Sequence, residues 1–224
     1  GYAGLLDLGY IAFYALGAYV YALLASPHLG LHWSPFVILP LGAVVAGIFG
    51  VLLGAPTLRL RGDYLAIVTL GFGEIVRLFM NNLDRPFNLT NGPQGINLID
   101  PLFTVQPFQL FGLRITSVYL YYYLFLFLAC LVVFISIRLQ DSRIGRAWMA
   151  VREDEMAAKA CGINTRNIKL LAFAMGASFG GVAGGLFAGF QGLVSPESFV
   201  LLEYIMVLCM VVLGGMGNIA GVIL

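Results

Sequence analysis

Long apolar stretches separated by short polar segments are the main pattern in this chain. No charged residue occurs between Asp7 and Arg59, and a helix needs about 20 apolar residues to cross a membrane. This region therefore predicts two crossings, at Leu8–Ala25 and Phe36–Ala55, joined by a turn over Pro27–Pro35. The turn holds both histidines and a tryptophan. Interfacial positions favour such amphipathic side chains, and a ligand-binding role is the alternative.

Three further apolar stretches continue the pattern. They cover Tyr64–Met80, Ser117–Ile137 and Leu170–Phe190, and they bring the predicted crossings to five. The next stretch, Phe199–Leu213, has only 15 residues. A helix of that length does not comfortably span the hydrocarbon core, so a re-entrant or discontinuous helix and a full crossing both remain open. The sequence GGMGN, at Gly214–Asn218, breaks this stretch before another apolar run begins.

Two of the predicted spans carry small residues at every fourth position, a pattern that lets two helix backbones approach closely. In the second span these residues are Gly42, Ala46, Gly50 and Gly54. Leu170–Phe190 carries two such rows, with Gly176, Gly180 and Gly184 in one and Gly181, Gly185 and Gly189 in the other. Two rows on one helix predict two close neighbours, and therefore a central place in a helical bundle.

Three charged residues lie inside apolar stretches, where charges are rare and usually face a cavity or a partner. They are Glu74 and Arg77, in the third span, and Glu203, in the last stretch. For Glu74 and Arg77, two interpretations remain open. One is a functional role in the membrane, and the other is an i,i+3 ion pair that holds the outer end of the span near the interface.

Glycines also mark two places where helices are predicted to break. At Gly71 and at Gly214–Gly217, discontinuous helix ends would offer backbone dipoles to a bound solute, as broken helices do in other transporters. Static packing of glycines against neighbouring helices explains the same residues, and the sequence alone does not separate these alternatives.

Arg138–Lys169 is the one long polar run, and it holds seven of the twelve Lys and Arg residues. Cytoplasmic loops of membrane proteins carry an excess of these residues, which places the run in the cytoplasm. Counting back through the crossings puts Pro56–Asp63 on the same side and Ser26–Pro35 and Asn81–Ser117 outside. The last of these is rich in Pro, Gly and Asn and predicts turns and short irregular pieces.

Within this run, Arg152–Gly162 predicts a short helix. Asp154 suits the N-cap, Glu155 and Lys159 stand at i,i+4, and Gly162 suits the C-terminal stop. A short charged helix on the cytoplasmic face of a membrane protein favours a docking element for a soluble partner. The alternative is a solvated loop without a partner.

Composition narrows the class of protein further. Hydrophobic residues make up 60% of the chain and charged residues 10%, with a mean hydropathy of +0.93, whereas soluble domains carry about 25% charged residues. A net charge of +1 without a basic, aromatic-interleaved surface gives no indication of nucleic-acid binding. The cysteines, Cys130, Cys161 and Cys209, are far apart and form no CxxC pair, so neither a disulfide framework nor a zinc site is predicted.

The sequence also bears on enzymatic and ATP-binding roles. The phosphate-binding pattern GxxxxGK[ST] is absent from the sequence, so any ATP must be bound by another subunit. A membrane-embedded enzyme is disfavoured because no paired carboxylates occur, and no cofactor is expected in this chain. A rival transport mechanism is an ion-coupled secondary transporter or channel for small amphipathic solutes, for which only Glu74 and Glu203 are available as mid-membrane acids.

Six blocks of this sequence resemble one family closely. They are GYAGLLDLGYIAFYALGAY, LRLRGDYLAIVTLGFGEIVR, NGPQGI, REDEMAAKACGINTRNIKLLAF, FAGFQGLVSPESF and VVLGGMGNIAGVIL. In the same order they are similar to blocks of the M-type permease subunit of the bacterial branched-chain amino acid ABC importer. The resemblance implies a multi-pass inner-membrane importer of Leu, Ile and Val. It also implies an H-type permease partner, two cytoplasmic ATPases that bind ATP and Mg, and a periplasmic amino-acid-binding protein.

The resemblance extends to a coupling motif, in which an acid, two Ala and a Gly sit in a groove of the ATPase. Ala157, Ala158 and Gly162 match its spacing, but Met156 occupies the place of the acid and Glu155 stands one residue early. The expected ATPase-coupling residues are Glu153, Asp154, Glu155, Ala157, Ala158 and Gly162. The implied mechanism moves a helix over Glu153–Gly162 as a rigid lever when the ATPases close.

The predicted fold class is therefore an all-α polytopic membrane protein. We expect a helical bundle with a cytoplasmic coupling helix and discontinuous helices, surrounded by the lipid bilayer. Residues 1–224 are expected to form a single transmembrane permease domain. Because there is no initiator Met and the last residues, IAGVIL, stop inside an apolar run, the chain is expected to be a fragment truncated at both ends.

Overall fold

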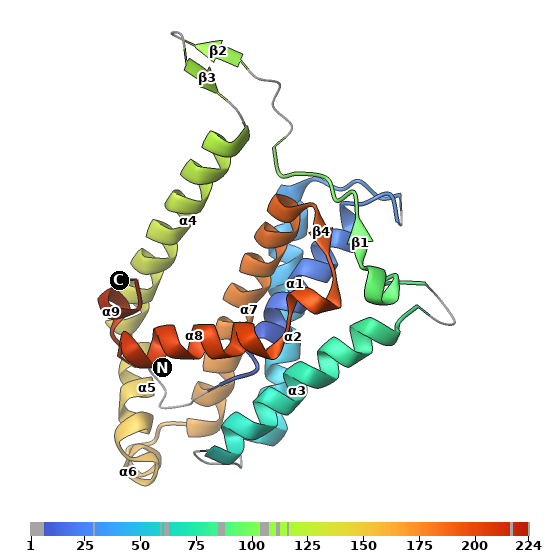
Figure 1. Cartoon of the computed structure of the whole chain (residues 1–224). Helices are drawn as coiled ribbons and strands as arrows, with labels where there is room; N and C mark the ends of the chain where they lie inside the picture. Colours follow the sequence, from blue (N-terminus) through green and yellow to red (C-terminus); the bar gives the residue numbers. More distant parts are fainter. Residues whose placement is uncertain are drawn as a thin grey trace.

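The computed structural model describes residues 7–28, 30–58, 60, 63–84, 88–103, 108–110, 113–115, 117–215 and 217–223. The helices are α1 (Tyr10–Leu24), α2 (Pro35–Thr57), α3 (Asp63–Asn82), α4 (Ser117–Gln140), α5 (Arg143–Glu153), α6 (Glu155–Ala160), α7 (Thr165–Gln191), α8 (Leu201–Leu213) and α9 (Ile219–Ile223). The short elements are the 3₁₀ turns η1 (Gly92–Gln94) and η2 (Pro196–Ser198) and the strands β1 (Ile96–Asn97), β2 (Phe108–Leu110), β3 (Leu113–Ile115) and β4 (Leu193–Val194). Figure 1 shows their arrangement.

The predicted all-α membrane fold is confirmed. Five described helical segments are long and apolar enough to cross a membrane, namely Pro35–Thr57, Tyr64–Asn82, Ser117–Gln140, Thr165–Gln191 and Pro196–Leu213. The predicted crossing at Leu8–Ala25 is wrong in its length. Helix α1 has only 15 residues, about 22 Å at 1.5 Å per residue, and so falls short of the roughly 30 Å core.

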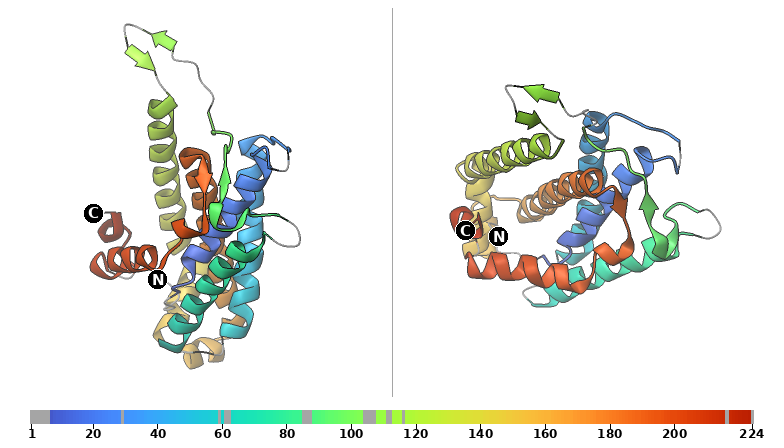
Figure 2. Two further views of the ribbon diagram at one scale, coloured as in Figure 1. Left: turned by 45° about the vertical axis from the view of Figure 1, so that its right-hand side comes forward. Right: turned by 45° about the horizontal axis from the view of Figure 1, so that its top comes forward.

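Helix α1 is buried on nearly all sides instead of facing lipid. Ala15, Ala18 and Tyr21 are at most 2% exposed, and the helix lies among α2, α3 and α7 (Figure 2). Its neighbours are close because Gly17 packs directly on the backbone of Gly181, where a Cβ would overlap the carbonyl group. Since protein surrounds α1, the helix does not need the length of a lipid-exposed span.

The small-residue stripe on α2 packs against α7, as predicted. Gly50 faces Phe173 and Ala177, and a Cβ on Gly50 would lie 2.6 Å from that of Ala177. Gly54, one turn further along, contacts the ring of Phe173. The missing side chains let α2 and α7 approach closely, which buries the polar backbone of both helices against protein.

Segments predicted to lie on the same side of the membrane meet at the same end of the bundle. At one end, Ala55 and Leu58 of the α2 terminus lie beside Lys159 and Lys169, so the two segments predicted to be cytoplasmic share a face. At the other end, His28 Nε2 lies 2.8 Å from the carbonyl oxygen of Asn88. The two connections predicted to lie outside therefore also meet.

Short backbone pairings close this outer end. Strand β1 pairs antiparallel with β4, with Ile96 opposite Val194, and β2 pairs with β3 as a separate hairpin. The amide of Asp100 donates to the carbonyl oxygen of Ala25 at 2.6 Å. The predicted irregular connection is confirmed over its described part, and residues 85–87, 104–107, 111–112 and 116 lie outside the described residues. Its β1 strand links the end of α3 to the end of α7.

Helices α8 and α9 depart from the up-and-down arrangement. Helix α8 runs across the bundle instead of along α4 and α7, and α9 follows after a break (Figures 1 and 2). This break at Gly214–Asn218 was predicted from the glycines and is confirmed. The predicted break at Gly71 is wrong, because α3 continues through Gly71 and Gly73 without interruption.

Candidate functional site

The polar segment after α4 folds as two helices, α5 and α6, followed directly by α7. The predicted single helix over Arg152–Gly162 is wrong, because Asp154 has extended backbone angles and separates them. Asp154 Oδ1 accepts the backbone N–H groups of Met156 at 2.7 Å and Ala157 at 3.1 Å. The predicted N-cap is therefore confirmed, but Glu153 ends α5 and does not belong to the same rigid helix as Gly162.

Helix α5 is fixed to the start of α7, which the sequence reasoning missed. The indole N–H of Trp148 donates to the carbonyl oxygen of Ile168 at 2.8 Å. Trp148 and Val151, three positions apart, are 4% and 5% exposed. That spacing is the signal of a helix with one buried face, and the Ser142 hydroxyl, which accepts the Gly145 N–H at 3.1 Å, marks the start of the helix.

Glu155 turns inward and forms the centre of a polar network between α6 and α7. Its carboxylate lies 2.6 Å from Lys169 Nζ and 3.1 Å from Lys159 Nζ, and it accepts the Thr165 hydroxyl at 3.3 Å. The hydrogen bond from Lys169, followed by that from Lys159, lowers the pKa of Glu155 to about 2. Lys169 is only 9% exposed, so the carboxylate is the group that neutralises a buried cation.

The outward surface of α6 consists of different residues. Met156 is 70% exposed, Ala157 is exposed, and Ala158 is buried at 3%. Gly162 has a φ of +84° with open space around its Cα, so the helix ends there in a left-handed turn. The expected coupling motif is thus divided, with Ala157 and Gly162 on the exposed side and Ala158 and Glu155 on the side of α7.

The two glycine rows of α7 face different sets of neighbours, with α1 common to both. Gly180 lies against Tyr10 and Phe13 of α1, and Gly184 lies against the α1 backbone at Tyr14. Gly176, the first member of this row, is exposed and has no atom within 4 Å of the Cβ position. Only the later part of this row therefore makes a helix contact in the described structure.

The second row contacts α2, α1 and the outer connection in turn. Gly181 meets Gly42 and Ala46, and Gly185 meets Leu39 and Tyr21. Gly189 meets Leu102 and Tyr21. Helix α7 consequently contacts α5 and α6 at its first residues and the tightly packed α1–α2 pair along the rest of its length.

Glu74 and Arg77 form the i,i+3 ion pair that was one of the two interpretations, with Arg77 Nε 3.0 Å from Glu74 Oε2. A guanidinium nitrogen of Arg77 also lies 3.7 Å from Glu197 in η2. One turn earlier on α3, Gly73 lies under the buried ring of Tyr204 from α8. The Tyr204 contact holds α8 against α3, whereas the longer pair with Glu197, which is 64% exposed, is a surface contact.

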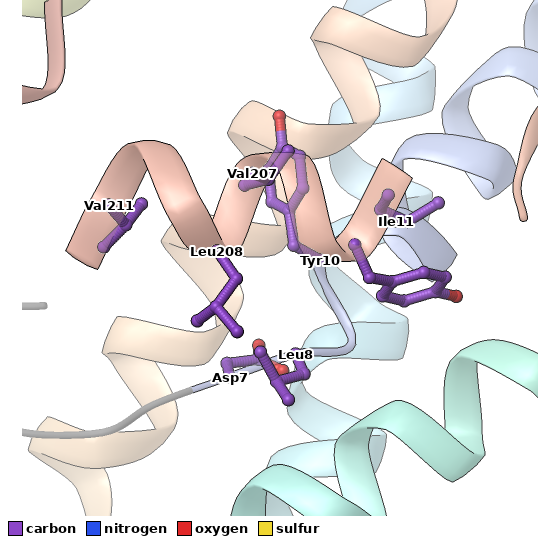
Figure 3. Close-up of a pocket in the computed structure, with 8 residues that line it drawn as sticks. Asp7, Leu8, Tyr10, Ile11, Val207, Leu208 and Val211 are labelled. Atoms are coloured by element: carbon purple, nitrogen blue, oxygen red, sulfur yellow. The ribbon is translucent and has the colours of Figure 1, made fainter. Parts of the chain in front are cut away.

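Two adjoining cavities lie between α1 and α8. One is lined by Asp7, Leu8, Tyr10, Ile11, Tyr204, Val207, Leu208 and Val211, and Figure 3 shows Leu208 extending toward Asp7 and Leu8. The other is lined by Tyr10, Ile11, Tyr14, Phe187, Ser198, Phe199, Glu203 and Val207. Glu203 therefore borders a cavity, and so does Asp7, which the sequence reasoning treated only as the start of a charge-free stretch.

The described residues contain no group of three or more His, Cys, Asp or Glu side chains that could hold a metal ion. Within the same ranges, the three cysteines are exposed and unpaired.

Comparisons with known proteins place the whole chain in one family. The family model for the permease component of branched-chain amino acid transport systems matches residues 1–224. The chain is 47% identical over 242 aligned residues to the high-affinity branched-chain amino acid transport system permease protein LivM of Escherichia coli K12, covering 100% of this chain and 55% of that protein. The probable LivM of Methanocaldococcus jannaschii is 32% identical over 84% of this chain and 53% of its own length.

A second kind of permease is also similar. The LivH permease protein of Salmonella typhimurium is 28% identical over 99% of this chain and 72% of its own length. No solved structure matches the chain. The chain spans about half the length of the LivM relatives that it matches.

The bundle of apolar helices and the basic segment on one face agree with the family model, which covers residues 1–224. The chain belongs to the family of permease components of branched-chain amino acid transport systems.

Proposed function

We propose that this chain is the core of an M-type permease subunit of an ABC importer that moves Leu, Ile and Val across the bacterial inner membrane. Residues 1–224 act as one transmembrane permease domain in this proposal. The chain binds no ATP itself, and its role is to form part of the path and to respond to ATPases on the cytoplasmic face. The similarity to both LivM and LivH relatives supports pairing with a related H-type permease.

The observation that carries the proposal is the connection from α6 to α7. An ABC permease needs an exposed element that a soluble ATPase pushes and a stiff link from that element into the membrane. The exposed surface of α6 provides the first, through Met156 and Ala157. Glu155, bonded to the buried Lys169 at 2.6 Å, provides the second, because Lys169 lies in the first turns of α7.

The motion would be passed on by close packing. Trp148 binds α5 to the same start of α7, so α5, α6 and the first turns of α7 move as one unit. Helix α7 contacts α1 and α2 through glycines that leave no gap. Since packed interiors do not deform continuously, displacement of α7 changes the arrangement of α1. The residues expected to meet the ATPase are therefore Met156, Ala157 and Gly162, while Glu153, Asp154, Glu155 and Ala158 shape the segment.

The experiment is reconstitution of the full-length protein with an H-type permease, two ATPases and a periplasmic amino-acid-binding protein in liposomes. Uptake of radiolabelled Leu is measured with and without ATP, and with an ionophore that dissipates ion gradients. ATP-dependent uptake that the ionophore leaves unchanged supports the proposal. Uptake that needs no ATP and is abolished by the ionophore would instead establish an ion-coupled secondary transporter.

A paired variant tests the coupling surface. Ala157→Arg places a long charged side chain on the exposed face of α6, and we expect the ATPase to be lost on co-purification. Ala160→Arg is the matched control, since Ala160 is also exposed on α6 but lies outside the motif positions. Equal retention of the ATPase by both variants and by the parent would contradict docking at Ala157.

A further inference from the structure

Helix α1 begins in the interior of the bundle and not at its cytoplasmic end. The backbone N–H of Leu8 donates to the hydroxyl of Thr69, in the first half of α3, at 3.0 Å. Tyr10 packs against Gly180, near the middle of α7. The start of α1 thus lies partway through the thickness of the bundle, where an ionisable group such as Asp7 is costly and usually functional.

Helix α8 reaches the same depth from the other side. It runs across the bundle (Figure 1), and its Tyr204 lies on Gly73, near the middle of α3. The two adjoining cavities lie where α8 passes the start of α1, and they share Tyr10, Ile11 and Val207. Their volumes are about 50 and 450 Å³. The larger lies within the range of small-molecule sites, which is roughly 300–1,000 Å³, and the smaller adjoins it and is bordered by Asp7.

The lining suits two parts of a branched-chain amino acid, its ammonium group and its branched aliphatic side chain. Val207, Leu208, Val211 and Ile11 give an apolar wall, drawn in Figure 3. Carboxylates border it on both sides, with Asp7 in the smaller cavity and Glu203 in the larger. A mostly apolar cavity with a few polar groups is typical of small-ligand sites, in which the polar groups fix orientation.

We propose that this space between α1 and α8 binds the branched-chain amino acid during transport. Asp7 and Glu203 attract its ammonium group, and Ile11, Val207 and Leu208 contact its aliphatic side chain. The inference rests on the proposed function and adds the residues that line the path. Asp7 is held in place because its Oδ1 accepts the Gly9 N–H at 2.8 Å, which fixes the carboxylate at the start of α1.

The test uses the complete reconstituted complex and compares Asp7→Asn and Glu203→Gln with the parent. Asparagine still accepts the Gly9 N–H, so the fold at α1 is kept while the charge is removed. Loss of a charge-assisted contact to the ammonium weakens binding by about tenfold or more. We expect at least one of the two variants to transport about tenfold less Leu per ATP hydrolysed.

Val207→Ala tests the same space without changing charge. Val207 lines both cavities, so its truncation enlarges the apolar space. We therefore expect the ratio of Leu uptake to Val uptake to change several-fold, up to about tenfold. Glu197→Gln is the matched control for charge removal, since Glu197 is 64% exposed and paired with Arg77 outside these cavities. This control is expected to transport like the parent.

The outcomes separate this inference from the proposed function. Absence of ATP-driven uptake by the parent complex would reject the proposed function itself. Normal ATP-driven uptake by the parent, together with unchanged uptake per ATP in Asp7→Asn and Glu203→Gln and an unchanged Leu to Val ratio in Val207→Ala, would overturn the site between α1 and α8.

Discussion

Lys169 and Glu155 lie 2.6 Å apart and join the start of α7 to the short helix α6. Lys169 is 9% exposed, so removal of Glu155 would leave a nearly buried cation with no carboxylate partner. The same carboxylate binds Lys159, but that lysine is 52% exposed. The contact to Lys169 is therefore the one that stabilises the fold, and the contact to Lys159 is an exposed ion pair.

The two lysines give a matched test. We expect Glu155→Gln to reduce the free energy of unfolding by about 1.5–3 kcal/mol, the range for hydrogen bonds to charged groups. Lys159→Ala should change it by less than about 1 kcal/mol, as exposed ion pairs do. Thermal unfolding of the purified protein in detergent measures both. A larger loss in Lys159→Ala than in Glu155→Gln would contradict the assignment.

The same carboxylate predicts a dependence on pH. Its pKa falls from an ordinary value near 4.5 to about 2 in the folded protein. A group with a lowered pKa stabilises the fold fully above its unfolded value, and this contribution disappears as the pH falls from about 4.5 toward 2. The difference in Tm between the parent and Glu155→Gln should therefore be constant near pH 7 and shrink at pH 3. A Tm difference that grows at low pH would contradict a lowered pKa of Glu155.

Glycines on α1 and α7 provide a steric test. A Cβ on Gly17 would overlap the backbone of Gly181, whereas Gly176 has open space around it. Gly17→Ala should destabilise the protein by about 1–3 kcal/mol or prevent folding, because neither backbone can yield. Gly176→Ala should be neutral or stabilise by up to about 1 kcal/mol, since alanine favours helix. The expression level and Tm of the two variants measure this difference in stability.

A second pair of glycines tests how α8 packs against α3. Gly73 lies under the Tyr204 ring, and Gly71, two residues earlier on α3, meets no atom within 4 Å. Gly73→Ala should displace Tyr204 and lower Leu uptake, while Gly71→Ala should not. Adding Tyr204→Ala to Gly73→Ala removes the overlap, so the two changes should be non-additive in a double-mutant cycle. Additive effects on Tm would refute a direct contact.

The cap of α6 can be tested locally. Asp154→Ala removes the acceptor for two backbone N–H groups, and N-cap losses of this kind cost about 0.5–2 kcal/mol. We expect faster hydrogen exchange over Glu155–Ala160 without a change in α7, and Asp154→Asn should restore most of the protection. Unchanged exchange in the alanine variant would show that the hydrogen bonds at Asp154 do not hold the helix.

Much of the bundle could be predicted from the sequence, because the length of each apolar stretch and the positions of the charges can be read within a single segment of the chain. The spans that became α2, α3, α4 and α7 follow directly from apolar stretches of sufficient length. The same holds for the break after Leu213, since three glycines within GGMGN disfavour a continuous helix. Gly71 misled the prediction because a glycine tolerated within a helix and a glycine that ends one look alike in sequence.

The parts that could not be predicted depend on contacts between distant residues. The depth of α1 depends on Thr69 and Gly180, and no local pattern reveals that Leu8 starts inside the bundle. Asp7 could not be recognised as a cavity residue for the same reason. Glu155 was included among the expected ATPase-coupling residues although it stands one residue before the acid position of the motif. Only the fold shows that its carboxylate is directed toward Lys169.

The short helix α1 also bears on how the protein is made. It emerges from the ribosome before α2, α3 and α7, which form its walls, and its 15 residues do not suffice to hold it across lipid alone. The packing of α1 in the described structure is therefore complete only after α7, whose glycines contact it, has been synthesised. A nascent chain halted before Thr165 would leave the segment around Gly17 open to chemical labelling, and release of the arrest would protect it.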